Sequence, residues 1–133
     1  MIHKEIKTRE DIHLLVTTFY DKVKIDPVIG AFFTETIPEE SWDTHLIKIT
    51  DFWETNLLFV KRFKGNPIAA HKNLDVKFNN QITQVHFGKW LELWIVTVDA
   101  LFTGEKAILA KERAKNIGFM LFLRIFEARG LSK

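Results

Sequence analysis

Histidine is the residue of this chain best suited to bind a metal, and one of its five histidines lies in a segment that suits a cofactor. His71 lies in the short run 67–74, which begins with a proline and places two alanines directly before the histidine. A neutral imidazole presented from a short helix is what an iron porphyrin needs as an axial ligand. A helix-capping or surface histidine is the alternative, and the position alone leaves both interpretations open.

The other histidines differ in how they lie relative to apolar helical faces. His3 is near the terminus and His13 lies beside an apolar face, so both are expected at the surface. His86 lies one turn before Trp90 and is a candidate for the edge of a pocket. His45 lies on the apolar face of its predicted helix, where it is either a rim residue of the core or a residue at the mouth of a ligand pocket, acting as a gate or a hydrogen-bond donor.

Three further side chains could act on a bound ligand. Tyr20 is the only tyrosine and takes an apolar position, so its hydroxyl bonds either to a backbone carbonyl or to a ligand. Trp90 has the same two options, with an indole N–H that can only donate. Two such donors in one cavity would stabilise a partly negative oxygen ligand. Lys48 is either solvated or reaches a carboxylate at the pocket edge.

Composition limits the classes of protein that this chain can represent. Its 133 residues, 47% of them hydrophobic, predict one globular domain spanning 1–133. The balance of 19 basic and 17 acidic residues, interleaved along the helices, argues against a nucleic-acid partner. The absence of cysteine excludes disulfides, thiolate metal sites and thiol catalysis. No signal-peptide pattern or long apolar run is present, so we expect a cytoplasmic protein with no membrane partner.

The aromatic content is unusual for so short a chain. Twelve phenylalanines and four tryptophans accompany the single tyrosine. A phenylalanine-rich core is one interpretation. The other is an apolar cavity lined with rings that binds a flat ligand.

Prolines and glycines divide the chain into helical segments. Asp26-Pro27 and Asn66-Pro67 each resemble an N-cap followed by proline in the first turn, and Pro38 opens a further helix. The expected elements are four long helices, near 12–23, 42–60, 80–102 and 105–129, and two short ones near 27–36 and 67–73. No strand is predicted. The stretch 61–81 is too rich in glycine, proline and asparagine for one helix, and we interpret it as a functional loop.

Several groups of residues follow one another along the chain in an order that is typical of a known family. In chain order they are Phe19-Tyr20-Asp21-Lys22-Val23, Ile29-Gly30-Ala31-Phe32-Phe33, Trp42 with His45, Ile49, Phe52 and Trp53, Pro67 with His71 and Leu74, and Trp90-Leu91 with Trp94. This ordered set resembles the third group of the truncated haemoglobins over roughly residues 8–129. The glycine pairs typical of the first two groups are absent, in agreement with the third.

The resemblance implies an all-α, truncated globin-like fold, a two-over-two helical sandwich around a haem b. His71 matches the iron ligand, and Tyr20, His45 and Trp90 match the distal residues that face a bound ligand. The further haem contacts that the resemblance implies are Phe33, with Phe32 beside it as the alternative, Ile49, Phe52, Trp53, Leu74, Trp90, and Lys48 toward a propionate.

Three functions remain open from the sequence. The first is a haemoglobin that binds, stores or transports O2 and also accepts NO or CO. The second is an enzyme at the same site, either an NO dioxygenase or a peroxidase-like enzyme acting on peroxide, which needs electrons from an external reductase. The third is a helical binding domain without haem.

Overall fold

The computed structural model describes residues 4–60 and 82–131, which are almost entirely helical. The elements are β1 (Lys4–Glu5), α1 (Arg9–Ile25), α2 (Gly30–Thr34), the 3₁₀ turn η1 (Glu39–Ser41), α3 (Trp42–Leu58), α5 (Gln84–Leu101), β2 (Phe102–Thr103) and α6 (Glu105–Leu131). The four predicted long helices are present. The predicted short helix near 67–73 and the loop over 61–81 lie outside the described residues.

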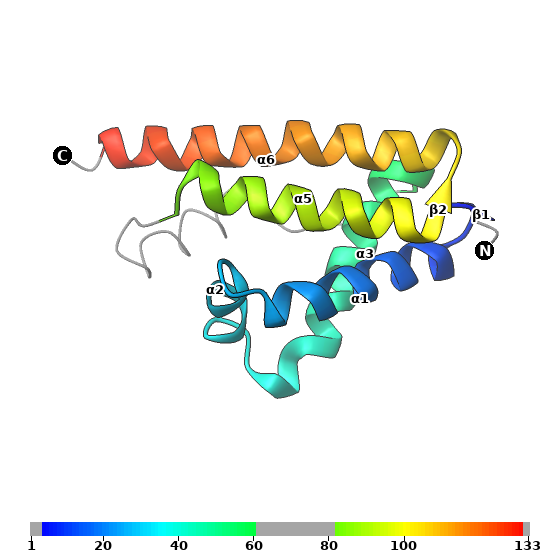
Figure 1. Ribbon diagram of the computed structural model, residues 1–133, viewed down its shortest axis with the longest axis horizontal. Coiled ribbons are helices and arrows are strands. Elements are labelled where there is room, and N and C mark those ends of the chain that lie inside the picture. The colour runs from blue at the N-terminus through cyan, green and yellow to red at the C-terminus, as the bar shows by residue number, and fades with distance from the viewer. Residues whose placement is uncertain (1–3, 61–81, 132–133) are drawn as a thin grey trace.

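The long helices form two layers of two (Figure 1). α5 and α6 lie side by side in one layer, and α1 and α3 pack on each other in the second. α1 also packs against α5, and α3 against α6, so each layer contacts the other. Among the described residues, no helix is both long and apolar enough to cross a membrane.

The apolar face of α1 forms the centre of the core, as its helical spacing predicts. Ile12, Leu15, Phe19 and Val23 are all buried. The helix starts with a capping box, because the Asp11 N–H donates to the Thr8 hydroxyl and the Thr8 N–H donates to the Asp11 carboxylate. The termini of this helix therefore have local partners before tertiary packing adds its contribution.

Asp11 is a buried acid with several donors around it. Burial by itself would raise the pKa of its carboxyl group, but the Lys4 ammonium and the backbone N–H groups of Lys7 and Thr8 outweigh this effect and hold the pKa below its usual range. The Lys4 Nζ lies 2.6 Å from the Asp11 Oδ1. The charged form of Asp11 thus ties the N-terminal segment to α1.

The connection from α1 to α2 differs from its sequence prediction. Asp26 accepts N–H groups from Val28 and Ile29, as an N-cap would, but these residues form a turn and α2 begins only at Gly30. A Cβ atom at Gly30 would lie 2.8 Å from the Lys24 carbonyl oxygen, so only glycine allows this close approach. The turn brings the start of α2 against the end of α1.

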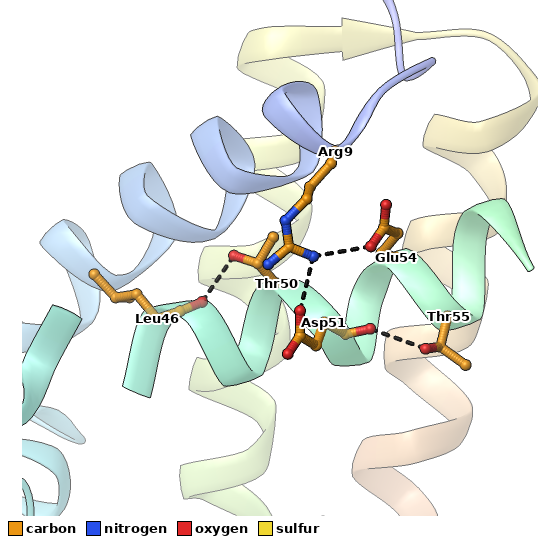
Figure 2. A network of polar contacts seen from close by, with 6 residues as sticks. All are labelled: Arg9, Leu46, Thr50, Asp51, Glu54 and Thr55. Carbon is orange, nitrogen blue, oxygen red and sulfur yellow. Dashed lines mark hydrogen bonds and ion pairs between the residues drawn. The ribbon is translucent and has the colours of Figure 1, made fainter. Parts of the chain in front are cut away.

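Ion pairs join α1 to α3 (Figure 2). One Arg9 guanidinium nitrogen lies 2.7 Å from the Asp51 Oδ1 and 2.8 Å from the Glu54 Oε1. Glu54 is nearly buried, so this pairing offsets part of the cost of desolvating its charge. Inside α3, the Thr50 hydroxyl donates to the Leu46 carbonyl oxygen at 2.7 Å. This α3 helix carries several of the predicted site residues.

A short parallel pairing of β1 with β2 was not predicted. Lys4 pairs with Phe102 and Glu5 with Thr103, and two residues per strand are too few for an alternating pattern to be visible in the sequence. Gly104 follows with a positive φ of 92°, a conformation that favours glycine, and turns the chain into α6. The separation of the predicted helices near 80–102 and 105–129 is therefore confirmed, and it lies at Gly104.

Candidate functional site

Tyr20 lies where α1, α2 and α3 meet. Its ring centroid is 5.7 Å from that of Phe33 on α2, and 5.8 Å and 5.6 Å from those of Trp42 and His45 on α3. Phe19 packs edge-to-face on it from the same helix, at 5.0 Å. Two of the predicted distal residues, Tyr20 and His45, are therefore direct neighbours.

The Tyr20 side chain is buried, with 5% of its surface exposed. Burial raises the pKa of its hydroxyl far above the ordinary value, so the group stays protonated at any physiological pH. Within the residues that the structure describes, no hydrogen bond engages this hydroxyl. The hydroxyl of a buried tyrosine normally makes a hydrogen bond, so the Tyr20 hydroxyl has the capacity to donate one to a ligand.

His45 is half-buried and packs edge-to-face on Tyr20 and on Trp42, 5.5 Å from the latter. Trp42 is 5% exposed and has the Lys24 ammonium 4.2 Å from its ring centroid. Because the cation–π contact and burial hold Trp42 in place, Trp42 limits the movement of the neighbouring Tyr20 and His45 rings. Trp42 belongs to the ordered set that carries the family resemblance but was given no role in the site, and the structure places it beside Tyr20.

An open cavity lies between the α1–α2 connection and the facing parts of α5 and α6. Its lining is apolar and aromatic apart from one histidine and one indole N–H; it comprises Ile29, Phe32, Phe33, Ile82, His86, Phe87, Trp90 and Leu121. Phe32, Phe33 and Trp90 were predicted to contact a cofactor. Phe33 also touches Tyr20, so this wall of the cavity adjoins the cluster around the tyrosine.

The two tryptophans of α5 differ in their hydrogen bonding. The buried Trp94 donates its Nε1–H to the Ala110 carbonyl oxygen at 3.1 Å, which ties α5 to α6. Trp90 is half-buried on the cavity wall, and its indole N–H makes no hydrogen bond with the described residues. Trp94 is therefore a structural residue, whereas Trp90 has a donor that a ligand can use.

Four of the other predicted contacts, all on α3, are not among the described residues that line this cavity. Trp53 is 2% exposed and stacks on Trp94 with a centroid distance of 4.4 Å, in the core. Ile49 and Phe52 are half-buried on α3, and Lys48 is exposed on the same helix. His71 and Leu74 lie outside the described residues, so the predicted iron ligand is not placed.

His86 was a predicted candidate for the edge of a pocket, and it lies in the lining of this cavity. Sequence reasoning missed four other lining residues. Phe87 lies three positions before Trp90, so the helical spacing around that tryptophan was a signal for it. Ile29, Ile82 and Leu121 carry no such signal, because packing between separate elements brings them together. Both interpretations of the aromatic content find support among the phenylalanines that the structure describes. Phe19 and Phe102 are buried in the core, with Phe52 packed against it, whereas Phe32, Phe33 and Phe87 line the cavity.

Comparisons with known proteins agree with this geometry. No protein-family model matches the chain. The group 3 truncated hemoglobin ctb of Campylobacter jejuni is 30% identical over 115 residues, which cover 85% of this chain and 87% of the relative. The chain belongs to the group 3 truncated haemoglobins. A crystal structure of a group III truncated hemoglobin from Campylobacter jejuni matches with a TM-score of 0.82 and 27% identity, covering 93% of this chain and 95% of that one.

Membership of this family confirms the predicted all-α, truncated globin-like fold and implies that the protein binds haem. The described residues of this truncated haemoglobin fit such a cofactor. Four aromatic rings line the cavity, and a flat conjugated macrocycle packs well between rings. The hydroxyl of the buried residue Tyr20 and the indole N–H of Trp90 supply two donors for a polar ligand. Haem supplies an iron atom that can bind a diatomic molecule.

Proposed function

We propose that this truncated haemoglobin binds a haem b through His71 and holds O2 between hydrogen-bond donors on the opposite face. The observation that carries the proposal is the hydroxyl of the buried residue Tyr20, which stays protonated and makes no hydrogen bond within the described residues. A residue used only for core packing would need no hydroxyl here, because phenylalanine offers the same ring.

Tyr20 and Trp90 are the proposed donors to the ligand. Haem would supply an iron atom on which an oxygen ligand would carry partial negative charge, and a hydrogen bond from either residue to a charged acceptor contributes about 1.5–3 kcal/mol. That energy corresponds to a roughly 10–150-fold slower dissociation of the ligand. His45 packs against Tyr20 and Trp42. We propose that it holds the tyrosine ring in place and acts as a third donor to the ligand.

The apolar side chains of the cavity would exclude water from the cofactor. Phe32, Phe33 and Phe87 offer no hydrogen-bonding groups, so water gains little by entering between them. A dry, low-dielectric surrounding also strengthens each hydrogen bond that the donors make. We therefore expect tight binding and slow release of O2, which suits storage or capture.

An enzymatic function at the same site is the second candidate. Two donors aimed at a ligand that develops negative charge also favour dioxygenation of NO to nitrate or reduction of peroxide, since both reactions build charge on oxygen. Either reaction consumes electrons, so an external reductase is the expected partner. The donor pair Tyr20 and Trp90 is the observation that supports this candidate.

The absorption spectrum of the protein expressed with a haem supply tests the proposal. We expect a Soret band at one haem per chain that shifts on reduction and again on addition of CO. His71→Ala should lose the band or change it strongly, whereas His13→Ala, at an exposed position of α1, should keep it. A protein without stoichiometric haem would overturn the proposal and favour a haem-free helical binding domain.

A second assay separates the two candidate functions. The haem-loaded protein is mixed with a chemical reductant and then with NO in the presence of O2, or with peroxide. Catalytic turnover that continues over many cycles and slows in Tyr20→Phe would support the enzyme. Stoichiometric binding of O2 without turnover would support storage or transport.

A further inference from the structure

His86 is the one titratable side chain in the lining of the cavity as far as the structure describes it. It occupies the third position of α5, and its neighbours Gln84 and Val85 are exposed, so it lies at the mouth of the cavity rather than at its floor. The other lining side chains are apolar or aromatic. Nothing in the proposed oxygen-binding site accounts for a polar, half-buried residue at this place.

Two contacts set the orientation of the His86 ring. Its Nδ1 accepts the backbone N–H of Thr83 at 2.9 Å, as the acidic or amide residue of a capping box normally does. The imidazole ring packs edge-to-face with the Phe32 ring, with a centroid distance of 4.7 Å. Because Nδ1 is an acceptor, the neutral ring carries its proton on Nε2. His86 therefore presents an Nε2–H donor, which makes no hydrogen bond with the described residues.

The surroundings of this donor favour an anionic acceptor. His86 lies in the first turn of α5, where the partial positive charge of the helix N-terminus attracts anions. That turn contains no acidic residue, in contrast to the first turns of α1 and α6. The nearest lysine in the sequence, Lys89, is paired with Asp26 at 3.5 Å and with Glu92 at 3.8 Å. Among the described lining residues, the imidazole is thus the titratable group that can donate to an anion.

We propose that the Nε2–H of His86 donates to a carboxylate at the edge of the bound cofactor, and that this contact fixes the rotation of the macrocycle in the cavity. The inference rests on the proposed function, because haem b is the cofactor whose edge carries carboxylates. The polar groups of haem b are its central iron and two propionates. A donor at the rim of a ring-lined cavity meets the propionate edge, which stays near solvent.

A matched pair of variants separates the charge at this position from the helix cap. In His86→Gln and His86→Glu the new side chain can still accept the Thr83 N–H, because both residues complete capping boxes at this position. Both apoproteins should therefore keep the start of α5 folded, and His86→Glu should melt at the temperature of His86→Gln or slightly above it, because its charge lies near the positive end of the helix. The two variants differ from each other only in the negative charge, which would face the propionate.

The measurement is the rate of cofactor transfer to an excess of apomyoglobin, followed in the Soret band. It is made with haem b and with its dimethyl ester, in which both carboxylates are neutral. We expect His86→Glu to release haem b about tenfold faster than His86→Gln, a factor that corresponds to roughly 1.4 kcal/mol. With the ester the two variants should release the cofactor at the same rate. The wild type should retain haem b longer than the ester, and His86→Gln should reduce that difference.

The outcomes distinguish the two proposals. A wild type that takes up neither cofactor overturns the proposed function and this inference with it. A wild type that takes up both, with variants that release haem b and the ester in the same ratio as the wild type does, overturns the assignment of His86 and leaves the haem site standing. A difference between Gln and Glu that persists with the ester also overturns it, because the charge would then act on something other than the carboxylates.

Discussion

Replacement of Tyr20 by phenylalanine removes one oxygen atom and keeps every ring contact of the residue. The neighbouring rings of Phe19, Phe33 and His45 lie 5.0–5.7 Å from the Tyr20 ring, and they pack equally well on phenylalanine. The hydroxyl makes no hydrogen bond with the described residues. The substitution should therefore act differently on the stability of the protein and on its ligand.

The expected magnitudes follow from that arrangement. Burial of an unpaired hydroxyl costs about 1–3 kcal/mol, so the variant apoprotein should be as stable as the wild type or more stable by up to that amount. Loss of a hydrogen bond to a charged ligand costs about 1.5–3 kcal/mol, so O2 should dissociate roughly 10–150-fold faster. CO carries less negative charge, and its dissociation should change less.

Two assays measure these effects on the same preparation. Urea unfolding of the apoprotein, followed by circular dichroism, gives the free energy of unfolding. Stopped-flow displacement of O2 by CO gives the dissociation rate of O2 in the reduced, haem-loaded protein. An unchanged O2 dissociation rate together with a less stable apoprotein would refute the reasoning, because Tyr20 would then be a structural residue that bonds within the protein.

Three further substitutions test the structural assignments. Trp94→Phe removes a buried hydrogen bond and should lower the free energy of unfolding by about 1–3 kcal/mol, as measured in urea, with little change in O2 dissociation. Asp11→Asn should lower the free energy of unfolding at pH 7, and the free energy of unfolding of the variant should fall less steeply than that of the wild type as the pH is lowered. The pKa of Asp11 is lowered in the folded state, so its contribution is present above its usual value of 3.8 and is lost as the pH falls through the folded-state pKa; an equally steep fall in the variant would contradict this. In Gly88→Ala no atom lies within 4 Å of the new methyl group, and alanine favours the helix. The free energy of unfolding should therefore rise by about 1 kcal/mol, and the melting temperature should rise with it.

Much of the fold could be predicted from the sequence, because helical spacing is a local property of the chain. The buried face of α1, the break at Gly104 and the four long helices follow from apolar periodicity and from glycine and proline positions. The start of α2 was predicted too early, since Asp26 accepts backbone N–H groups in a turn as readily as in a helix cap. Pairing of β1 with β2 joins distant segments and leaves no local pattern.

For the candidate site, too, residue types predicted one part, and contacts between helices decided the rest. The residue types alone marked Tyr20 and Trp90 as donors and showed that each had two possible partners. Only the packing of α1, α2 and α3 decided that Tyr20 is buried among rings, with no hydrogen bond from the described residues to its hydroxyl. The packing around α5 decided that Trp90 lines a cavity while Trp94 bonds to a carbonyl of α6. The spacing of His86 from Trp90 marked it as a candidate for the edge of a pocket, but its neighbours in that pocket come from separate elements and only the structure shows them.

The sequence by itself determined that this protein is a helical, cysteine-free chain whose ordered aromatic and histidine residues resemble one globin family. These properties depend on residue type and on spacing within single helices. The tertiary structure alone decided which donors have partners and which rings enclose a cavity. That choice depends on contacts between helices far apart in the sequence, where a side chain's neighbours are set by packing rather than by its own position in the chain.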